Sequence, residues 1–236
     1  MSGITSSSVS SSVVHPYLDM LPPGVGPKLE ILKHLDIPDL VKIAKTSREW
    51  EELAYHNVVW LEIARKISLP VEADFALGTI APGEMRNRVI QFMATLKEEI
   101  RAIRYGEQIG KFDNLANQGL SIHLINKIQK YVKAIQIMII KFRTLDGHDH
   151  FEAGTTVEED IESAENFPEW FNSNLPQIDL KDRFDFSYTG ISFLPSEIGD
   201  LKNLQMILIR DTRLSTDDPV LQKLKARGVE INTTSR

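Results

Sequence analysis

The chain has 236 residues, of which 42% are hydrophobic and 25% charged, a composition typical of soluble globular proteins with one sizeable domain or two small ones. No apolar run approaches the roughly 20 residues that a membrane-spanning helix needs, so no membrane partner is expected. The sequence contains no cysteine, which excludes disulfides, cysteine-ligated zinc and a thiol nucleophile.

Charge is unevenly distributed along the chain. Residues 1–150 contain 18 Lys and Arg against 17 Asp and Glu, whereas residues 151–236 contain 9 against 16, which gives the overall net charge of −6. An acidic C-terminal part argues against nucleic acid as a ligand, because phosphate backbones are bound by clustered Lys and Arg side chains.

The patterning predicts four segments. Residues 1–18 are rich in serine and lack the basic start and apolar stretch of a secretory signal peptide, so we expect a disordered tail. The remaining segments are a compact helical domain at 19–70, a helical linker domain at 71–150, and a C-terminal module with an acidic helical cap at 151–236.

Three short helices are predicted within residues 19–70. Asp36 is placed to cap the second helix, with Pro38 just inside it. The third helix carries Trp50, and Trp60 follows ten residues later. The simplest interpretation is a three-helix element whose two tryptophans serve a small shared core.

The same residues resemble the F-box family. In that family a Leu-Pro start is followed by an apolar helix, an L-D-x-x-D-L segment, an S-x-x-W segment and a second Trp ten residues on. Residues 35–40 and 47–50 of this chain fit the two segments, and Trp60 fits the second Trp. The Leu21-Pro22 pair lies about two residues further from Ile31 than is usual in the family.

The F-box resemblance implies a partner. F-box helices dock on the Skp-family adaptor of cullin–RING ubiquitin ligases by burying apolar helix faces. Carried onto this chain, the implied adaptor-binding residues are Leu21, Pro22, Leu29, Leu32, Leu35, Leu40 and Ile43.

Two long amphipathic helices are predicted in the linker domain, at residues 85–106 and 122–142. Their apolar side chains recur every three or four residues, which is the spacing that burial on one face requires. We expect them to form core, and the alternative is a helix–helix dimer seam. An acidic helix at residues 158–170 is expected to cover the start of the next module.

Apolar residues repeat at a period of 23 in the C-terminal part. The pairs are Leu175 and Ile198, Ile178 and Leu201, Phe184 and Ile207, Phe186 and Ile209, Thr189 and Thr212, and Ile191 and Leu214. A further step reaches Leu221, Leu224, Val229 and Ile231, about one residue short for the last two. The alternation of Ile207 and Ile209 predicts a short strand, and units this small must stack to bury a core.

Residues 194–204 read L-P-x-x-I-x-x-L-x-x-L and resemble the leucine-rich repeat (LRR) family. The resemblance implies a short stack with two to three parallel strands, in which Thr189 and Thr212 occupy the usual place of an asparagine. The predicted fold class is α+β, mostly α. The side chains that point outward from the strands are predicted to bind a partner, namely Arg183, Asp185, Ser187, Tyr188, Met206, Leu208 and Arg210.

Together the two resemblances imply an adaptor that links an unidentified target protein, through the repeats, to a ubiquitin ligase. The alternatives are a scaffold in which the F-box-like helices only cap the repeats, or, third, an enzyme. The layout is also similar to short LRR proteins of chlamydia-related intracellular bacteria, which implies a cytoplasmic location, or the host cytosol for a secreted effector.

Catalytic and metal-binding patterns are sparse. The sequence contains no phosphate-binding G-x-x-x-x-G-K-[ST] loop and no G-x-S-x-G motif. The stretch from His148 to His150 offers two imidazoles, but no third ligand is evident near it. We therefore expect neither a cofactor nor a catalytic residue.

Overall fold

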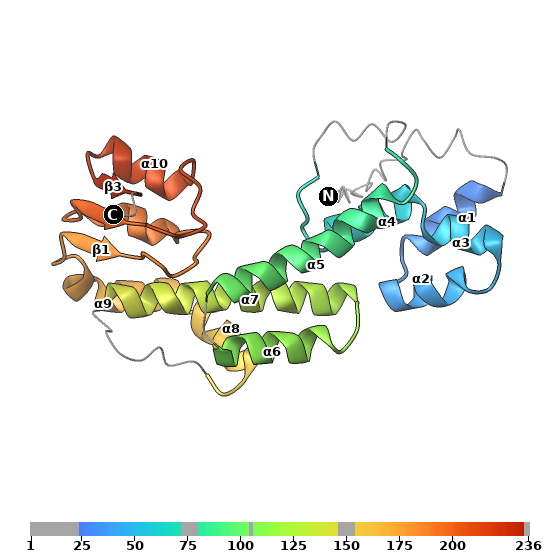
Figure 1. Cartoon of the computed structure of the whole chain (residues 1–236), viewed down its shortest axis with the longest axis horizontal. Helices are drawn as coiled ribbons and strands as arrows, with labels where there is room; N and C mark the ends of the chain where they lie inside the picture. The colour runs from blue at the N-terminus through green and yellow to red at the C-terminus, as the bar shows by residue number, and fades with distance from the viewer. Residues whose placement is uncertain (1–23, 72–79, 104–105, 146–153, 234–236) are drawn as a thin grey trace, which may run out of the picture. The chain divides into compact units, whose positions relative to one another are not determined.

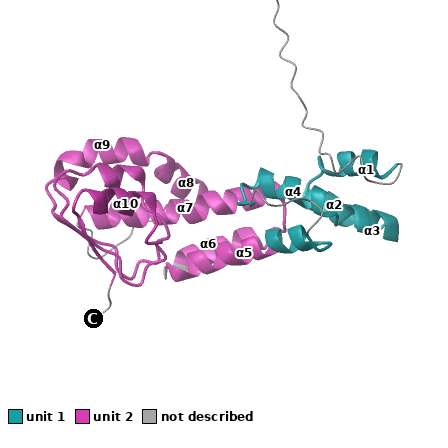
Figure 2. Cartoon of the chain, turned by 90° about the horizontal axis from the view of Figure 1, so that it is seen from above, with its two compact units in different colours: residues 1–89 teal, residues 90–236 magenta. Residues whose placement is uncertain are grey.

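The computed structural model describes residues 24–71, 80–103, 106–145 and 154–233 (Figure 1). Leu21, Pro22 and the stretch from His148 to His150 lie outside these residues. The chain divides into two compact units, residues 1–89 and 90–236 (Figure 2).

The described part of the first unit contains four short helices where three were predicted. The fourth exists because Trp60 lies on a helix of its own, which starts after a break at Tyr55 and His56. His56 caps that helix, since its Nδ1 accepts a hydrogen bond of 3.3 Å from the backbone N–H of Val58. The helices are α1 (Val25–Leu32), α2 (Ile37–Ala44), α3 (Arg48–Ala54) and α4 (Asn57–Lys66), followed by the start of α5 (Glu84–Ala102).

Helix starts in this unit follow the sequence closely. The Asp36 carboxylate accepts a 2.7 Å hydrogen bond from the N–H of Ile37, and Pro38 lies in the first turn, so the predicted cap of α2 is confirmed. Ser47 caps α3 by accepting from the N–H of Trp50 at 3.3 Å. Such caps satisfy N–H groups that have no partner within the helix.

The core of the first unit is apolar and includes one tryptophan. Trp60 is buried, and its indole Nε1–H donates to the carbonyl of Ala54 at 2.9 Å, which satisfies the one polar group of the side chain. Trp50 is only half-buried, so it is a surface residue as much as a core one.

Helices form the first half of the second unit. The break between α8 and α9 corrects the prediction of one acidic helix over residues 158–170. It falls at Asn166, because Pro168 has no N–H and cannot continue the hydrogen bonding of α8. The helices are the remainder of α5, then α6 (Gly106–Ala116), α7 (Ile122–Thr144), α8 (Val157–Glu165) and α9 (Phe167–Ile178).

A three-stranded parallel sheet follows, in the order β1-β2-β3, as the prediction of two to three parallel strands required. Phe184 pairs with Ile207, which is the predicted 23-residue step. Ile207 pairs with Ile231, a step of 24 residues. The interval from β2 to β3 is therefore one residue longer than 23, whereas the sequence pattern predicted an interval about one residue shorter. The elements are β1 (Arg183–Asp185), the 3-10 helix η2 (Ser196–Asp200), β2 (Met206–Leu208), α10 (Pro219–Ala226) and β3 (Glu230–Asn232).

The turns that follow β1 and β2 also repeat at an interval of 23 residues. The Thr189 hydroxyl donates to the carbonyl three residues earlier at 2.6 Å, and Thr212 makes the equivalent bond at 2.9 Å. The residues just before them, Tyr188 and Asp211, both have positive φ, at 61° and 50°. The first two strands, β1 and β2, are therefore each followed by the same turn, closed by a threonine.

One apolar core joins the helices of the second unit to its strands. It contains Ile135 and Ile139 of α7 together with Phe184 and Ile207 of the sheet. Gly190 lies where the turn after β1 meets the end of α5, and a Cβ there would come within 2.4 Å of the Ala102 carbonyl oxygen. The predicted boundaries at 70/71 and 150/151 stay predictions.

Candidate functional site

Helix α1 presents its apolar residues on two sides. Leu29 and Leu32 are buried in the core of the first unit, whereas Ile31 between them is 63% exposed. A large aliphatic side chain so exposed on a short helix is a candidate contact for a partner. It was not among the residues singled out from the sequence, because the family motif draws attention to the leucines.

The predicted adaptor-binding residues on α1, α2 and the turn between them divide by exposure. Leu40 is buried like Leu29 and Leu32, while Leu35 and Ile43 are half-buried. Only the half-buried pair can present apolar surface without a rearrangement of the helices. Contact of any of these residues with an adaptor stays a prediction.

Charged and aromatic groups connect α1 to α3. Lys28 pairs with Glu49, and its ammonium lies 5.3 Å from the ring centre of Trp50. This arrangement holds the half-buried indole in place beside an ion pair. The Ser-x-x-Trp segment thus supplies a helix cap and a fixed aromatic surface.

The outward face of the sheet is more polar than predicted. Arg183 and Asp185 are exposed, and Tyr188 is 54% exposed, so these side chains are accessible as expected. Met206 is half-buried, but Leu208 is only 3% exposed. The predicted apolar spot is therefore reduced to part of Met206.

Hydrogen bonds fix the backbone around this face. Ser187 is buried, and its hydroxyl accepts from the N–H of Arg210 on the neighbouring chain segment at 3.3 Å. The Asp185 carboxylate accepts from the N–H of Ser187 at 2.9 Å. Ser187 therefore organises the turn, and Arg210, which is half-buried, stands beside it.

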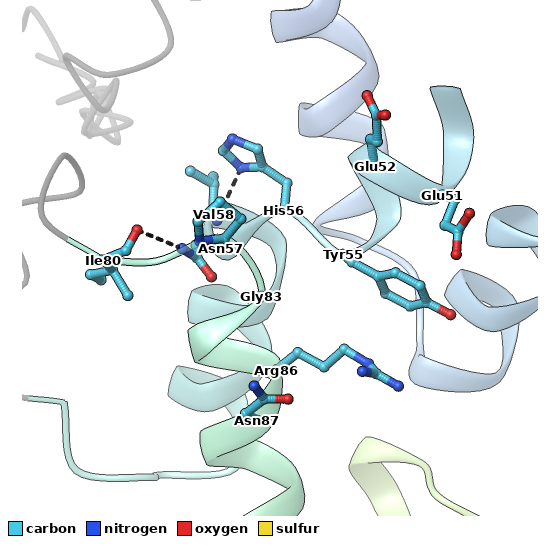
Figure 3. Close-up of a pocket in the computed structure, with 11 residues that line it drawn as sticks. Glu51, Glu52, Tyr55, His56, Asn57, Val58, Ile80, Gly83, Arg86 and Asn87 are labelled. Atoms are coloured by element: carbon cyan, nitrogen blue, oxygen red, sulfur yellow. Dashed lines mark hydrogen bonds between the residues drawn. The ribbon is translucent and has the colours of Figure 1, made fainter. Parts of the chain in front are cut away.

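A pocket of about 570 Å³ lies within the first unit, between the turn that joins α3 to α4 and the start of α5 (Figure 3). Asn57 ties its walls together by donating to the carbonyl of Ala81 at 2.9 Å and accepting from the N–H of Met85 at 3.2 Å. Its lining residues are Glu51, Glu52, Tyr55, His56, Asn57, Val58, Ile80, Pro82, Gly83, Arg86 and Asn87.

The described parts of the chain show neither a cluster of metal-binding side chains nor a membrane-spanning helix. There, no three His, Asp or Glu side chains gather closely enough to hold a metal ion. Nor does any helix there combine the length and apolar character needed to cross a membrane.

Comparison with known proteins matches residues 27–66 to the F-box-like family. The match runs from within α1 to the end of α4, and these helices are therefore an F-box-like domain, the kind of module that binds other proteins. No curated protein and no solved structure matches the chain. The similarity to short LRR proteins of chlamydia-related bacteria stays a prediction.

Proposed function

We propose that this protein is an adaptor that joins a target protein to a cullin–RING ubiquitin ligase. The observation that carries the proposal is the F-box-like domain at residues 27–66, a module that typically binds Skp-family adaptors. Its exposed Ile31 and half-buried Leu35 and Ile43 offer apolar surface on α1, on α2 and on the turn between them. Burial of such a surface drives helix docking between proteins.

The target would bind the C-terminal module, which we propose is a short leucine-rich repeat stack. Support comes from its parallel strands, its 23-residue step and its repeated threonine turn. Arg183, Asp185 and Tyr188 supply a polar and aromatic surface, a composition common in non-obligate interfaces. The protein would act in the cytoplasm, or in a host cytosol for a secreted effector.

The adaptor proposal is tested by size-exclusion chromatography of the purified chain with a Skp-family adaptor. We expect co-elution at micromolar concentration and a loss of affinity of about tenfold or more in Ile31→Asp, since a buried charge without a partner opposes docking. Leu180→Asp is the matched control, because Leu180 is 82% exposed and lies in the second unit. Absence of a complex with the unaltered chain would refute the proposal.

The alternative is a scaffold in which the F-box-like helices have only a structural role. The complete burial of Leu29, Leu32 and Leu40 favours it, since these residues serve the core of the first unit. Under this alternative, Ile31→Asp would leave every interaction of the chain unchanged, and the adaptor would not co-elute.

A further inference from the structure

The pocket in the first unit contains an arginine that differs from its neighbours. The other three arginines of this unit each form an ion pair with a glutamate three or four residues away, namely Arg48 with Glu52, Arg65 with Glu62 and Arg88 with Glu84. Arg86 forms no ion pair and no side-chain hydrogen bond within the described structure, although two glutamates line the same pocket.

Aromatic rings hold the Arg86 guanidinium in a fixed place. Its central carbon lies 4.6 Å from the ring centre of Tyr55 and 6.0 Å from that of Trp60. Figure 3 shows the side chain extending from α5 to lie beside the ring of Tyr55. Stacking leaves the N–H groups at the edge of the guanidinium plane free, and these match a carboxylate in a bidentate arrangement.

Other lining residues complete a site for an apolar group that carries one carboxylate. The Tyr55 hydroxyl and the Asn87 amide are further donors, while Val58 and Ile80 supply apolar wall. The hydrogen bonds of Asn57 fix that wall before any ligand arrives, which lowers the entropic cost of binding.

The pocket also carries Glu51 and Glu52, both exposed. Two carboxylates in the same pocket as one guanidinium disfavour polyanions such as nucleic acid or polyphosphate. Glu52 pairs with Arg48, which leaves Glu51 to attract a positive group of the ligand. A ligand with one carboxylate, an apolar side chain and a nearby cation matches all three features.

We propose that this pocket binds the C-terminal carboxylate of a partner polypeptide, with Arg86 as its anchor, an apolar last side chain against Val58 and Ile80, and a basic residue upstream near Glu51. The volume of about 570 Å³ falls in the range of drug-sized ligands and accommodates a few terminal residues. The proposal does not depend on the ligase adaptor, because none of these residues belongs to the predicted adaptor contacts.

The test measures fluorescence anisotropy of the full chain with an N-terminally labelled tetrapeptide, Ala-Lys-Gly-Leu, that ends in a free carboxylate. We expect saturable binding, and binding weaker by about tenfold or more for the same peptide with a C-terminal amide, because the charge-assisted bonds to Arg86 are lost. Arg86→Gln should weaken binding as much, and Arg86→Lys nearly as much, since lysine lacks the planar fork.

Arg88→Gln is the matched control, since Arg88 is exposed, lies on the same helix and already pairs with Glu84. It should bind the free-carboxylate peptide within about twofold of the unaltered chain. Equal binding of acid and amide, unchanged binding by Arg86→Gln, or no saturable binding would each overturn the proposal. If 4-methylpentanoate displaced the labelled peptide as effectively as the unlabelled peptide does, the proposal that the ligand is a polypeptide would be overturned. The comparison of acid with amide uses the unaltered chain, so it does not depend on the folding of a variant.

Discussion

Asp160 is a single residue on which several parts of the second unit depend. Its carboxylate is fully buried, accepts from the N–H of Gly154 at 2.7 Å and lies 2.9 Å from the ammonium of Lys111. Lys111 also donates to the carbonyl of Gly154 at 2.6 Å. One ion pair thus ties α6, α8 and the backbone before α8 together.

Asp160→Asn should lower the free energy of unfolding by about 3 kcal/mol, because it leaves the Lys111 ammonium largely buried without its counter-charge. Glu165→Gln is the control, since its ion pair with Lys130 is exposed and should contribute less than about 1 kcal/mol. Urea unfolding followed by circular dichroism measures both. Equal losses in the two variants would contradict the role given to Asp160.

His56 makes the stability of the first unit depend on pH. Burial lowers the pKa of its imidazole below the ordinary value of 6.5, and its Nδ1 caps α4 by accepting from Val58. As pH falls through 6.5, the unfolded chain binds a proton that the folded chain does not. The stabilisation present above 6.5 should therefore decrease on acidification.

His56→Asn should remove this part of the pH dependence, because asparagine caps a helix without titrating. Thermal unfolding between pH 8 and pH 5 should show a shallower fall of the midpoint in the variant than in the unaltered chain. An identical pH dependence in both would show that His56 does not carry it.

Among the elements, the threonine turns distinguish the repeated strands from an ordinary small sheet. Thr189 is buried and Thr212 is half-buried, yet their hydroxyls make the same bond to a carbonyl three residues earlier. In the leucine-rich repeat stack that we propose, these threonines would occupy the usual place of an asparagine. The parallel strands nevertheless keep their register through the first step.

Thr189→Val should lower the free energy of unfolding by about 1–3 kcal/mol, because the Phe186 carbonyl loses its donor in a buried place. Thr212→Val should cost less, since water can replace the lost donor at the half-buried position. Urea unfolding of both variants compares the two turns directly. If Thr212→Val lowered the free energy of unfolding more than Thr189→Val does, burial would not be the cause of the difference between the two turns.

On the scale of the whole molecule, the second unit should fold only when it is complete. Its core joins Ile135 and Ile139 of α7 to Phe184 and Ile207 of the sheet, so the strands alone lack part of their apolar contacts. A stack of so few repeated strands cannot bury its own core unless another element covers it.

A fragment of residues 90–236 should therefore unfold cooperatively, whereas a fragment of residues 151–236 should show no cooperative transition. Circular dichroism during thermal and urea unfolding distinguishes the two outcomes. Stable folding of the shorter fragment would support the predicted boundary at 150/151 and would contradict a core shared with α7.

Local features were determined by the sequence itself. The cap at Asp36, the helix starting at Ile122 and the 23-residue step from Phe184 to Ile207 depend on residue type and spacing, and each could be predicted from them. The F-box-like match likewise depends on a linear motif.

Only the tertiary structure decided which apolar side chains remain accessible and which polar groups lack a partner. Leu40 and Ile31 look alike in a sequence pattern, but packing buries the first and exposes the second. That Arg86 forms no ion pair within the described residues also depends on how α5 meets the turn before α4. Burial and pairing depend on contacts between segments distant in sequence, and a one-dimensional pattern does not contain them.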